Sequence, residues 1–234
     1  LALGAADIVV TEAGFGSDMG AEKFMHIKAA NSGKAPDCVV MNVTVRSMKL
    51  HGGAFGSRGG YRPSREELDA EDIEAVKRGA QGNLDRHIRN MAGFGMPVIV
   101  SINRFTADTD GELEALTATA RASGAHAVTL TEVHANGGKG GEPLAKAVVS
   151  AIQDHVAAGR PFTPLFLKDA PVMEKVNGIA KRIYKAEGVV VEAKAKKQLA
   201  AIESWGYGHL PVCMAKTQYS FSHDAGQLGA PVGF

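Results

Sequence analysis

The feature that most limits the possible folds is an alternation of short apolar runs with stretches of helical spacing. Four runs rich in Val and Ile are expected to be strands, at residues 8–11, 38–45, 97–102 and 127–130. Their nearly continuous hydrophobicity is typical of strands that are buried on both faces in a parallel sheet. The order of strand, helix and strand therefore predicts an α/β fold with crossover helices.

The helices between these runs are marked by their start signals and by a change of pattern near residue 160. Ser64 and Thr109 are each followed three residues later by Glu, which is the capping-box spacing. A further helix is expected over residues 142–157. The turn-rich segment 159–164 predicts a boundary between an α/β domain at 1–160 and a smaller α+β domain at 161–234. The smaller domain is expected to hold a helix after Asp169, a helix near 193–205 and a short strand at 211–214.

The composition argues against several classes of partner. The 26 Lys and Arg residues nearly balance the 25 Asp and Glu residues, so the net charge of +1 gives no case for nucleic acid binding. No apolar run approaches the roughly 20 residues that span a bilayer. Cys38 and Cys213 lie in apolar runs and are expected to be buried thiols in a reducing compartment. The eight histidines are scattered, and no metal site is expected.

Two Gly-rich loops follow expected strands, at residues 14–20 and 137–141, and a third Gly-rich stretch at 52–60 is expected to be a flexible loop. Glycine lets backbone N–H groups approach an anion closely, so Gly14, Gly16, Gly137 and Gly138 are candidates for an anion or phosphate loop. The first loop has the spacing G-x-G-x-x-x-G, which is one residue longer than a dinucleotide fingerprint. Simple turns are the alternative for both loops.

Polar side chains follow the third and fourth expected strands. Asn103 offers a donor and an acceptor to a purine edge, Asp108 offers acceptors, and Thr131 lies after the neighbouring strand. Ligands of open α/β sheets bind beyond the carboxyl ends of strands, so these three residues are candidates for nucleotide binding. The alternative is that Asn103 and Asp108 shape a turn and cap the next helix.

Rings also gather at the expected strand ends. Phe15, Phe105 and His134 follow three different strands. Ordinary packing beneath a loop is the better explanation of any one of these rings, whereas the three together are more suggestive of stacking on a flat heterocycle in one crevice. Three basic residues follow another expected strand end: Arg46, Lys49 and His51. They are expected either to add positive charge to the crevice at the strand ends or to be solvated surface charges.

Taken together, these stretches resemble one family. The chain contains VTEAGFG at 10–16, GAEKF at 20–24, TVR at 44–46, HGG at 51–53, NRFTADT at 103–109, GGKG at 137–140 and LPVCMAKTQ at 210–218, in that order. The series resembles formate–tetrahydrofolate ligase over essentially all 234 residues. The resemblance implies a partial P-loop NTPase-like, mainly parallel sheet flanked by helices. Residues 1–160 would then be the C-terminal part of a nucleotide- and folate-binding domain, and residues 161–234 a smaller α+β domain that is truncated at its C-terminus.

The resemblance also implies a reaction, in which ATP phosphorylates formate and tetrahydrofolate takes the formyl group to give 10-formyltetrahydrofolate, ADP and phosphate. It implies ATP with Mg²⁺, tetrahydrofolate, a monovalent cation in the full enzyme, a cytoplasmic homotetramer, and no nucleic acid or membrane partner. Phe15, Phe105, Leu130 and His134 match positions that line the folate slot, with His134 where the family usually has Trp. Thr106 stands where Pro is common.

The resemblance further suggests that this chain is the C-terminal portion of such a ligase. No G-x-x-x-x-G-K-[ST] loop occurs in it. The phosphate-binding lysine loop, the formyl-phosphate arginine and the catalytic residues are therefore expected upstream of Leu1. The chain alone is expected to bind rather than to react. The alternative is a non-catalytic remnant that binds folate or a partner.

Overall fold

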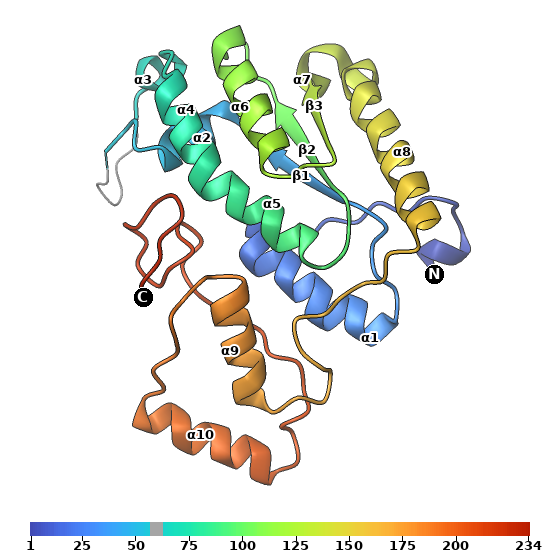
Figure 1. Ribbon diagram of the computed structural model, residues 1–234, viewed down its shortest axis with the longest axis vertical. Helices are drawn as coiled ribbons and strands as arrows, with labels where there is room; N and C mark the ends of the chain where they lie inside the picture. Colours follow the sequence, from blue (N-terminus) through green and yellow to red (C-terminus); the bar gives the residue numbers. More distant parts are fainter. Residues whose placement is uncertain (57–62) are drawn as a thin grey trace.

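The computed structural model describes residues 1–56 and 63–234, and its architecture is α/β (Figure 1). Part of the Gly-rich stretch expected as a loop at 52–60 lies outside these residues. Helices surround a small parallel sheet, and the C-terminal third of the chain extends from one end of this layered body.

The sheet has three strands in the order β1-β2-β3, namely β1 (Val39–Val43), β2 (Val98–Asn103) and β3 (Ala127–Thr131). All pairs are parallel, and the register sets Val43 beside Ile102 and Asn103 beside Thr131. The strands expected at 38–45, 97–102 and 127–130 are thus confirmed, and so is the parallel sheet.

The strand expected at residues 8–11 is wrong. This segment has no regular secondary structure and pairs with none of the three strands. Ile8 and Val10 are exposed, Val10 by 90%. An apolar run becomes a strand only where a neighbouring strand accepts its backbone hydrogen bonds, and no such partner lies beside it among the described residues.

The helices follow the expected start signals. Ser64 and Thr109 are N-caps with complete capping boxes, so both predictions are confirmed. The 142–157 helix is α8, which begins and ends within a residue of its expected bounds. The elements outside the sheet up to residue 158 are η1 (Ala2–Gly4), η2 (Gly16–Ala21), η3 (Phe24–Ala29), α1 (Ala30–Ser32), α2 (Val45–His51), α3 (Arg65–Asp69), α4 (Ile73–Gly79), η4 (Ala80–Leu84), α5 (Asp85–Ala92), α6 (Asp110–Ala122), α7 (Val133–Asn136), η5 (Gly137–Gly141) and α8 (Glu142–Ala158).

The two faces of β2 have different covers. Val98, Val100 and Ile102 belong to the main hydrophobic cluster together with residues of α5 and α6. Because side chains alternate along a strand, Ser101 and Asn103 lie on the opposite face. The picture places α5 and α6 on one side of the sheet and α8 on the other, and α8 packs along β3 (Figure 1).

Residues 161–234 contain the two helices α9 (Val172–Arg182) and α10 (Ala193–Ser204) and no strand. The strand expected at 211–214 is therefore wrong, and this part of the chain is helical and irregular rather than α+β. Ile179, Ile183 and Phe221 are buried in the same hydrophobic cluster as β2. The Pro211–Met214 region packs against that cluster through Val212 and Met214 without forming a ladder.

Two further features concern the cysteines and the helix lengths. Both cysteines are free; Cys38 is half-buried and Cys213 is exposed, so the expectation of two buried thiols is wrong. None of the helices in the described part of the chain is both long and apolar enough to cross a bilayer.

A buried ion pair joins the helices at the carboxyl end of the sheet. The Nζ of Lys49 on α2 lies 2.7 Å from the Oε1 of Glu112 on α6, and both side chains are at most 2% exposed. Lys49 also donates to the carbonyl oxygens of Leu68 and Ala70, and Glu112 accepts from the backbone N–H of Asp72. Lys49 thus holds helices together, and the alternative that it is a solvated surface charge is wrong.

Removing one partner of this pair should be costly because the other charge stays buried without compensation. We expect Lys49→Met to lower the free energy of unfolding by about 3–5 kcal/mol, measured by urea denaturation. Lys77→Met is the control, because Lys77 forms an exposed pair with Glu74 and its loss should cost under about 1 kcal/mol. Equal, small losses in both variants would contradict this role.

Candidate functional site

The carboxyl ends of β2 and β3 lie side by side and form one edge of the sheet. Asn103 and Thr131 are partners in the ladder, and the backbone N–H of Arg104 donates to the carbonyl of Thr131 at 3.2 Å. The Arg104 guanidinium also lies 3.3 Å from the Glu132 carboxylate. The loops that follow the two strands are therefore tied to each other, a link that the sequence analysis missed.

Phe105 is held on this edge from two directions. Its backbone N–H donates to the Oδ2 of Asp108 at 2.8 Å, which fixes the turn that carries the ring. The guanidinium carbon of Arg46 lies 4.2 Å from the ring centroid, a cation–π contact. Arg46 is itself paired with Asp69 at 2.6 Å. One face of the ring is therefore covered, and the residue remains 36% exposed.

Asp108 has a defined role within the loop. Its side chain is buried, and burial is the main cause that raises the pKa of its carboxyl group above the ordinary value. The helix cap is Thr109, whose hydroxyl accepts from the N–H of Glu112. Asp108 therefore shapes the turn, as the alternative reading of the sequence expected, and it does so through its Oδ2 atom.

The candidates on β3 divide between the two faces of the sheet. Leu130 pairs with Ile102 and shares the face of α5 and α6, whereas Thr131 shares the face of Asn103. Leu130 is 39% exposed, and the hydroxyl of Thr131 lies 2.6 Å from that of Ser101. One edge of the sheet therefore presents an apolar residue on one face and a polar group on the other.

His134 and Phe15 are both exposed. His134 lies on α7, directly after β3. Phe15 is 80% exposed and precedes η2. Among the described residues, no ring contact or hydrogen bond joins Phe15 to Phe105 or to His134. Phe105 follows β2, Leu130 lies near the end of the neighbouring strand β3, and His134 follows β3. Phe15 is therefore not joined to this group by a ring contact or a hydrogen bond in the described part of the chain.

The second Gly-rich loop leads into the N-terminus of the longest helix. Gly137 has a φ of +56°, and a Cβ on Gly140 would lie 2.3 Å from the carbonyl oxygen of Glu132. The Glu132 N–H donates to the Gly140 carbonyl, which closes the loop against the end of β3. These contacts explain two of the glycines structurally, while Gly138 is open to its surroundings.

The first Gly-rich loop is anchored to the C-terminal part of the chain. A Cβ on Gly20 would lie 1.7 Å from the Gly14 carbonyl oxygen, so this tight approach requires glycine. Asp18 pairs with Lys216 at 3.1 Å, and its carbonyl accepts from the Tyr184 hydroxyl at 2.8 Å. Lys216 belongs to the LPVCMAKTQ stretch, so the two motifs meet in space.

The same loop contacts a histidine in a desolvated environment. The Oγ of Ser17 lies 2.5 Å from the Nδ1 of His87. Desolvation lowers the pKa of His87 to about 3, and the neighbouring His51, Lys216 and Arg86 act in the same direction. His51 accepts a hydrogen bond from the Gly229 N–H and faces the C-terminal segment. Of the three basic residues expected at the crevice, Arg46 alone has a contact with a candidate site residue in the described structure.

Comparison with known proteins agrees with the motif series. The family model described as "Formate--tetrahydrofolate ligase" matches residues 1–234. Curated proteins named formate–tetrahydrofolate ligase match 99% of this chain: those of Ruegeria sp. (strain TM1040) at 48% identity, Hyphomonas neptunium at 49% and Roseobacter denitrificans at 49%. The chain spans only 39% of the length of each of these relatives.

The fold and the strand-end residues define an α/β protein whose candidate ligand site lies at the carboxyl edge of a parallel sheet. The chain belongs to the formate–tetrahydrofolate ligase family.

His87 should make the fold sensitive to mild acid. The unfolded chain protonates this histidine near its ordinary pKa of 6.5, whereas the folded state keeps it neutral down to about pH 3. The unfolded state then binds more protons, so stability is lost as the pH falls. From about pH 7 to about pH 5 we expect His87 to lower the free energy of unfolding by about 2 kcal/mol, measured by urea denaturation.

The matched test compares His87→Asn, whose amide can still face the Ser17 hydroxyl, with substitution of the exposed His223. His87→Asn should remove most of the loss between these pH values, and His223→Asn should retain it. The same acid sensitivity in both variants would show that His87 is not its source.

Proposed function

We propose that this chain provides the tetrahydrofolate- and nucleotide-binding edge of a formate–tetrahydrofolate ligase. In the reaction, ATP phosphorylates formate, and the N10 of tetrahydrofolate attacks formyl phosphate to give 10-formyltetrahydrofolate, ADP and phosphate. The residues of this chain bind and orient the substrates. Membership of the family supports the proposal, and so does the arrangement of the sheet edge.

The observation that carries the proposal is the constraint on Phe105. Asp108 fixes its backbone and Arg46 covers one face of its ring, so the other face remains for a ligand. A flat pterin stacks on such a ring at little cost in side-chain entropy, because the ring is already held. Leu130 would add apolar area and His134 a second, smaller ring; Phe15 completes the proposed folate slot from its own loop.

The opposite face of the same edge suits the nucleotide. Asn103 and Thr131 lie together there, and Asn103 can offer a donor and an acceptor to adenine. In this proposal Asp108 contributes through the turn that it holds, in addition to any direct contact with the base. Gly137 and Gly138 precede the N-terminus of α8, where backbone N–H groups favour an anion, and Gly14 and Gly16 have the same role at η2.

Phosphoryl transfer would depend on groups outside these 234 residues. The chain contains no G-x-x-x-x-G-K-[ST] loop and spans 39% of the relatives' length. No cluster of three or more His, Cys, Asp or Glu side chains occurs among the described residues, so Mg²⁺ is proposed to arrive bound to ATP. A monovalent cation, a homotetramer and a cytoplasmic location complete the proposal by analogy with the family.

Truncation of the ring should affect one substrate selectively. In the ligase that contains this chain, we expect Phe105→Ala to raise the KM for tetrahydrofolate by about tenfold or more. The reason is that the variant loses the stacked ring and the apolar area that the ring would bury against the pterin. The KM for ATP should stay within about twofold. His134→Trp should lower the KM for tetrahydrofolate, because the indole offers a larger stacking area.

Phe166→Leu is the matched control, because this Phe stacks on His26 away from the sheet edge. It should leave both KM values unchanged at a temperature where the protein is folded. An equal effect of Phe105→Ala on both substrates, or none on either, would contradict the proposed slot. Folate binding without any product formation by the natural protein would favour the non-catalytic alternative.

A further inference from the structure

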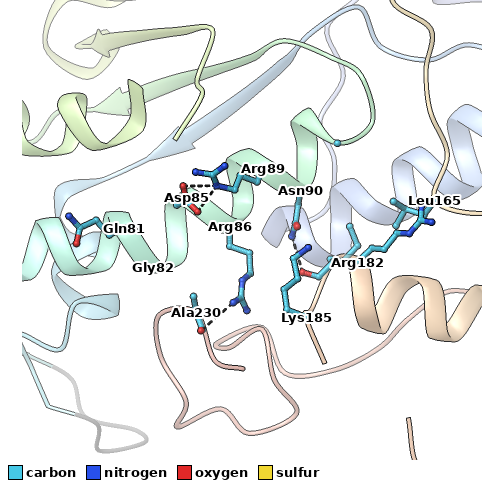
Figure 2. Close-up of a pocket in the computed structure, with 12 residues that line it drawn as sticks. Gln81, Gly82, Asp85, Arg86, Arg89, Asn90, Leu165, Arg182, Lys185 and Ala230 are labelled. Carbon is cyan, nitrogen blue, oxygen red and sulfur yellow. Dashed lines mark hydrogen bonds and ion pairs between the residues drawn. The ribbon is translucent and has the colours of Figure 1, made fainter. Parts of the chain in front are cut away.

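A cleft of about 430 Å³ lies between α5 and the C-terminal part of the chain, away from the sheet edge (Figure 2). We call it the cationic cleft. Its charged lining consists of one carboxylate, Asp85, and four cations, Arg86, Arg89, Arg182 and Lys185. None of the candidate folate or nucleotide residues lines it. Its volume falls in the range of small-molecule sites.

Three backbone carbonyl oxygens at the cleft already accept hydrogen bonds from side chains that line it. Arg86 donates to the carbonyl oxygen of Ala230, and Asn90 donates to that of Ile183 at 3.0 Å (Figure 2). Arg86 also donates to the carbonyl oxygen of Pro231 at 2.7 Å. Carbonyl oxygens that would otherwise repel an anion are thus paired. The carboxylate of Asp85 is likewise neutralised, since both of its oxygens accept from the Arg89 guanidinium.

Two cations remain without such partners. In the described part of the chain, the side chains of Arg182 and Lys185 have no hydrogen bond or ion pair, and both are exposed. Arg182 ends α9, where a cation also complements the helix dipole. Lys185 lies beyond the helix, so the dipole does not account for it. The cleft therefore presents uncompensated positive charge.

The backbone of Lys185 gives a second, independent observation. It has a φ of +59°, and in the described residues no other non-glycine residue has a positive φ. The N–H of Ala186 donates to the carbonyl of Ala180, so Lys185 occupies the left-handed position that usually holds glycine after a helix. A lysine is strained there, and this lysine is one of the residues that line the cleft.

We propose that the cationic cleft binds a small polyanion, a molecule that carries two or more phosphate or carboxylate groups. Arg182 and Lys185 contact the anionic groups directly, while Arg89 at the opposite wall is paired with Asp85. Guanidinium groups pair with both kinds of oxyanion through two parallel hydrogen bonds. Since α5 forms one wall and the end of α9 the other, the ligand joins the two parts of the chain. This site does not depend on the proposed ligase reaction.

The test is calorimetric titration of the purified natural protein with inorganic tripolyphosphate and, in a separate arm, with citrate. Binding should be detected for at least one of them and should weaken as salt increases. Tighter binding of tripolyphosphate assigns phosphate groups as the ligand chemistry, and tighter binding of citrate assigns carboxylates. Failure of both probes to bind would overturn the proposal.

Variants locate the binding. Lys185→Gly removes the charge and suits the left-handed backbone, so this variant should fold; combined with Arg182→Ala it should weaken binding by about tenfold or more. The control is Lys196→Ala with Lys197→Ala on α10, which removes the same charge outside the cleft. It should change the affinity by less than about twofold. Equal weakening in both double variants would overturn the site, because it would indicate a general charge effect.

Discussion

The buried pair of Lys49 and Glu112 is the interaction on which the arrangement of the sheet edge depends. Glu112 is at the third position of α6, where it completes the capping box of Thr109 and accepts from the backbone before α4. Lys49 brings α2 to the same carboxylate. Because α2 carries Arg46 and the Thr109 cap ends the loop of Phe105, this pair joins the two elements that hold the cation and the ring.

This arrangement shows how a small sheet can keep the two proposed binding sites apart. The alternation of side chains sends Leu130 to one face and Asn103 with Thr131 to the other, while the Arg104–Glu132 pair keeps the two following loops together. The proposed folate slot and nucleotide slot then meet at one edge, with Asp108 in the turn between them. Transfer between two substrates requires such proximity, since holding reactants together supplies much of the rate enhancement.

The sequence predicted the parts of this structure that depend on local patterns. Three continuous apolar runs became parallel strands, and the spacings after Ser64 and Thr109 became capping boxes, because both signals act within a few residues. The run at 8–11 and the segment 211–214 did not become strands, because a strand needs a partner that its own sequence does not specify. Lys49 resembled a surface cation for the same reason: its partner lies 63 residues away, at Glu112.

The most direct test of the folate edge is hydrogen–deuterium exchange of the natural protein with and without tetrahydrofolate. Binding at the proposed edge should slow exchange in residues 103–109 and 130–134, because these loops would lose their freedom to open. The segments around α10 should be unaffected. Unchanged exchange at both loops under saturating tetrahydrofolate, or slowed exchange confined to other parts of the chain, would contradict the account.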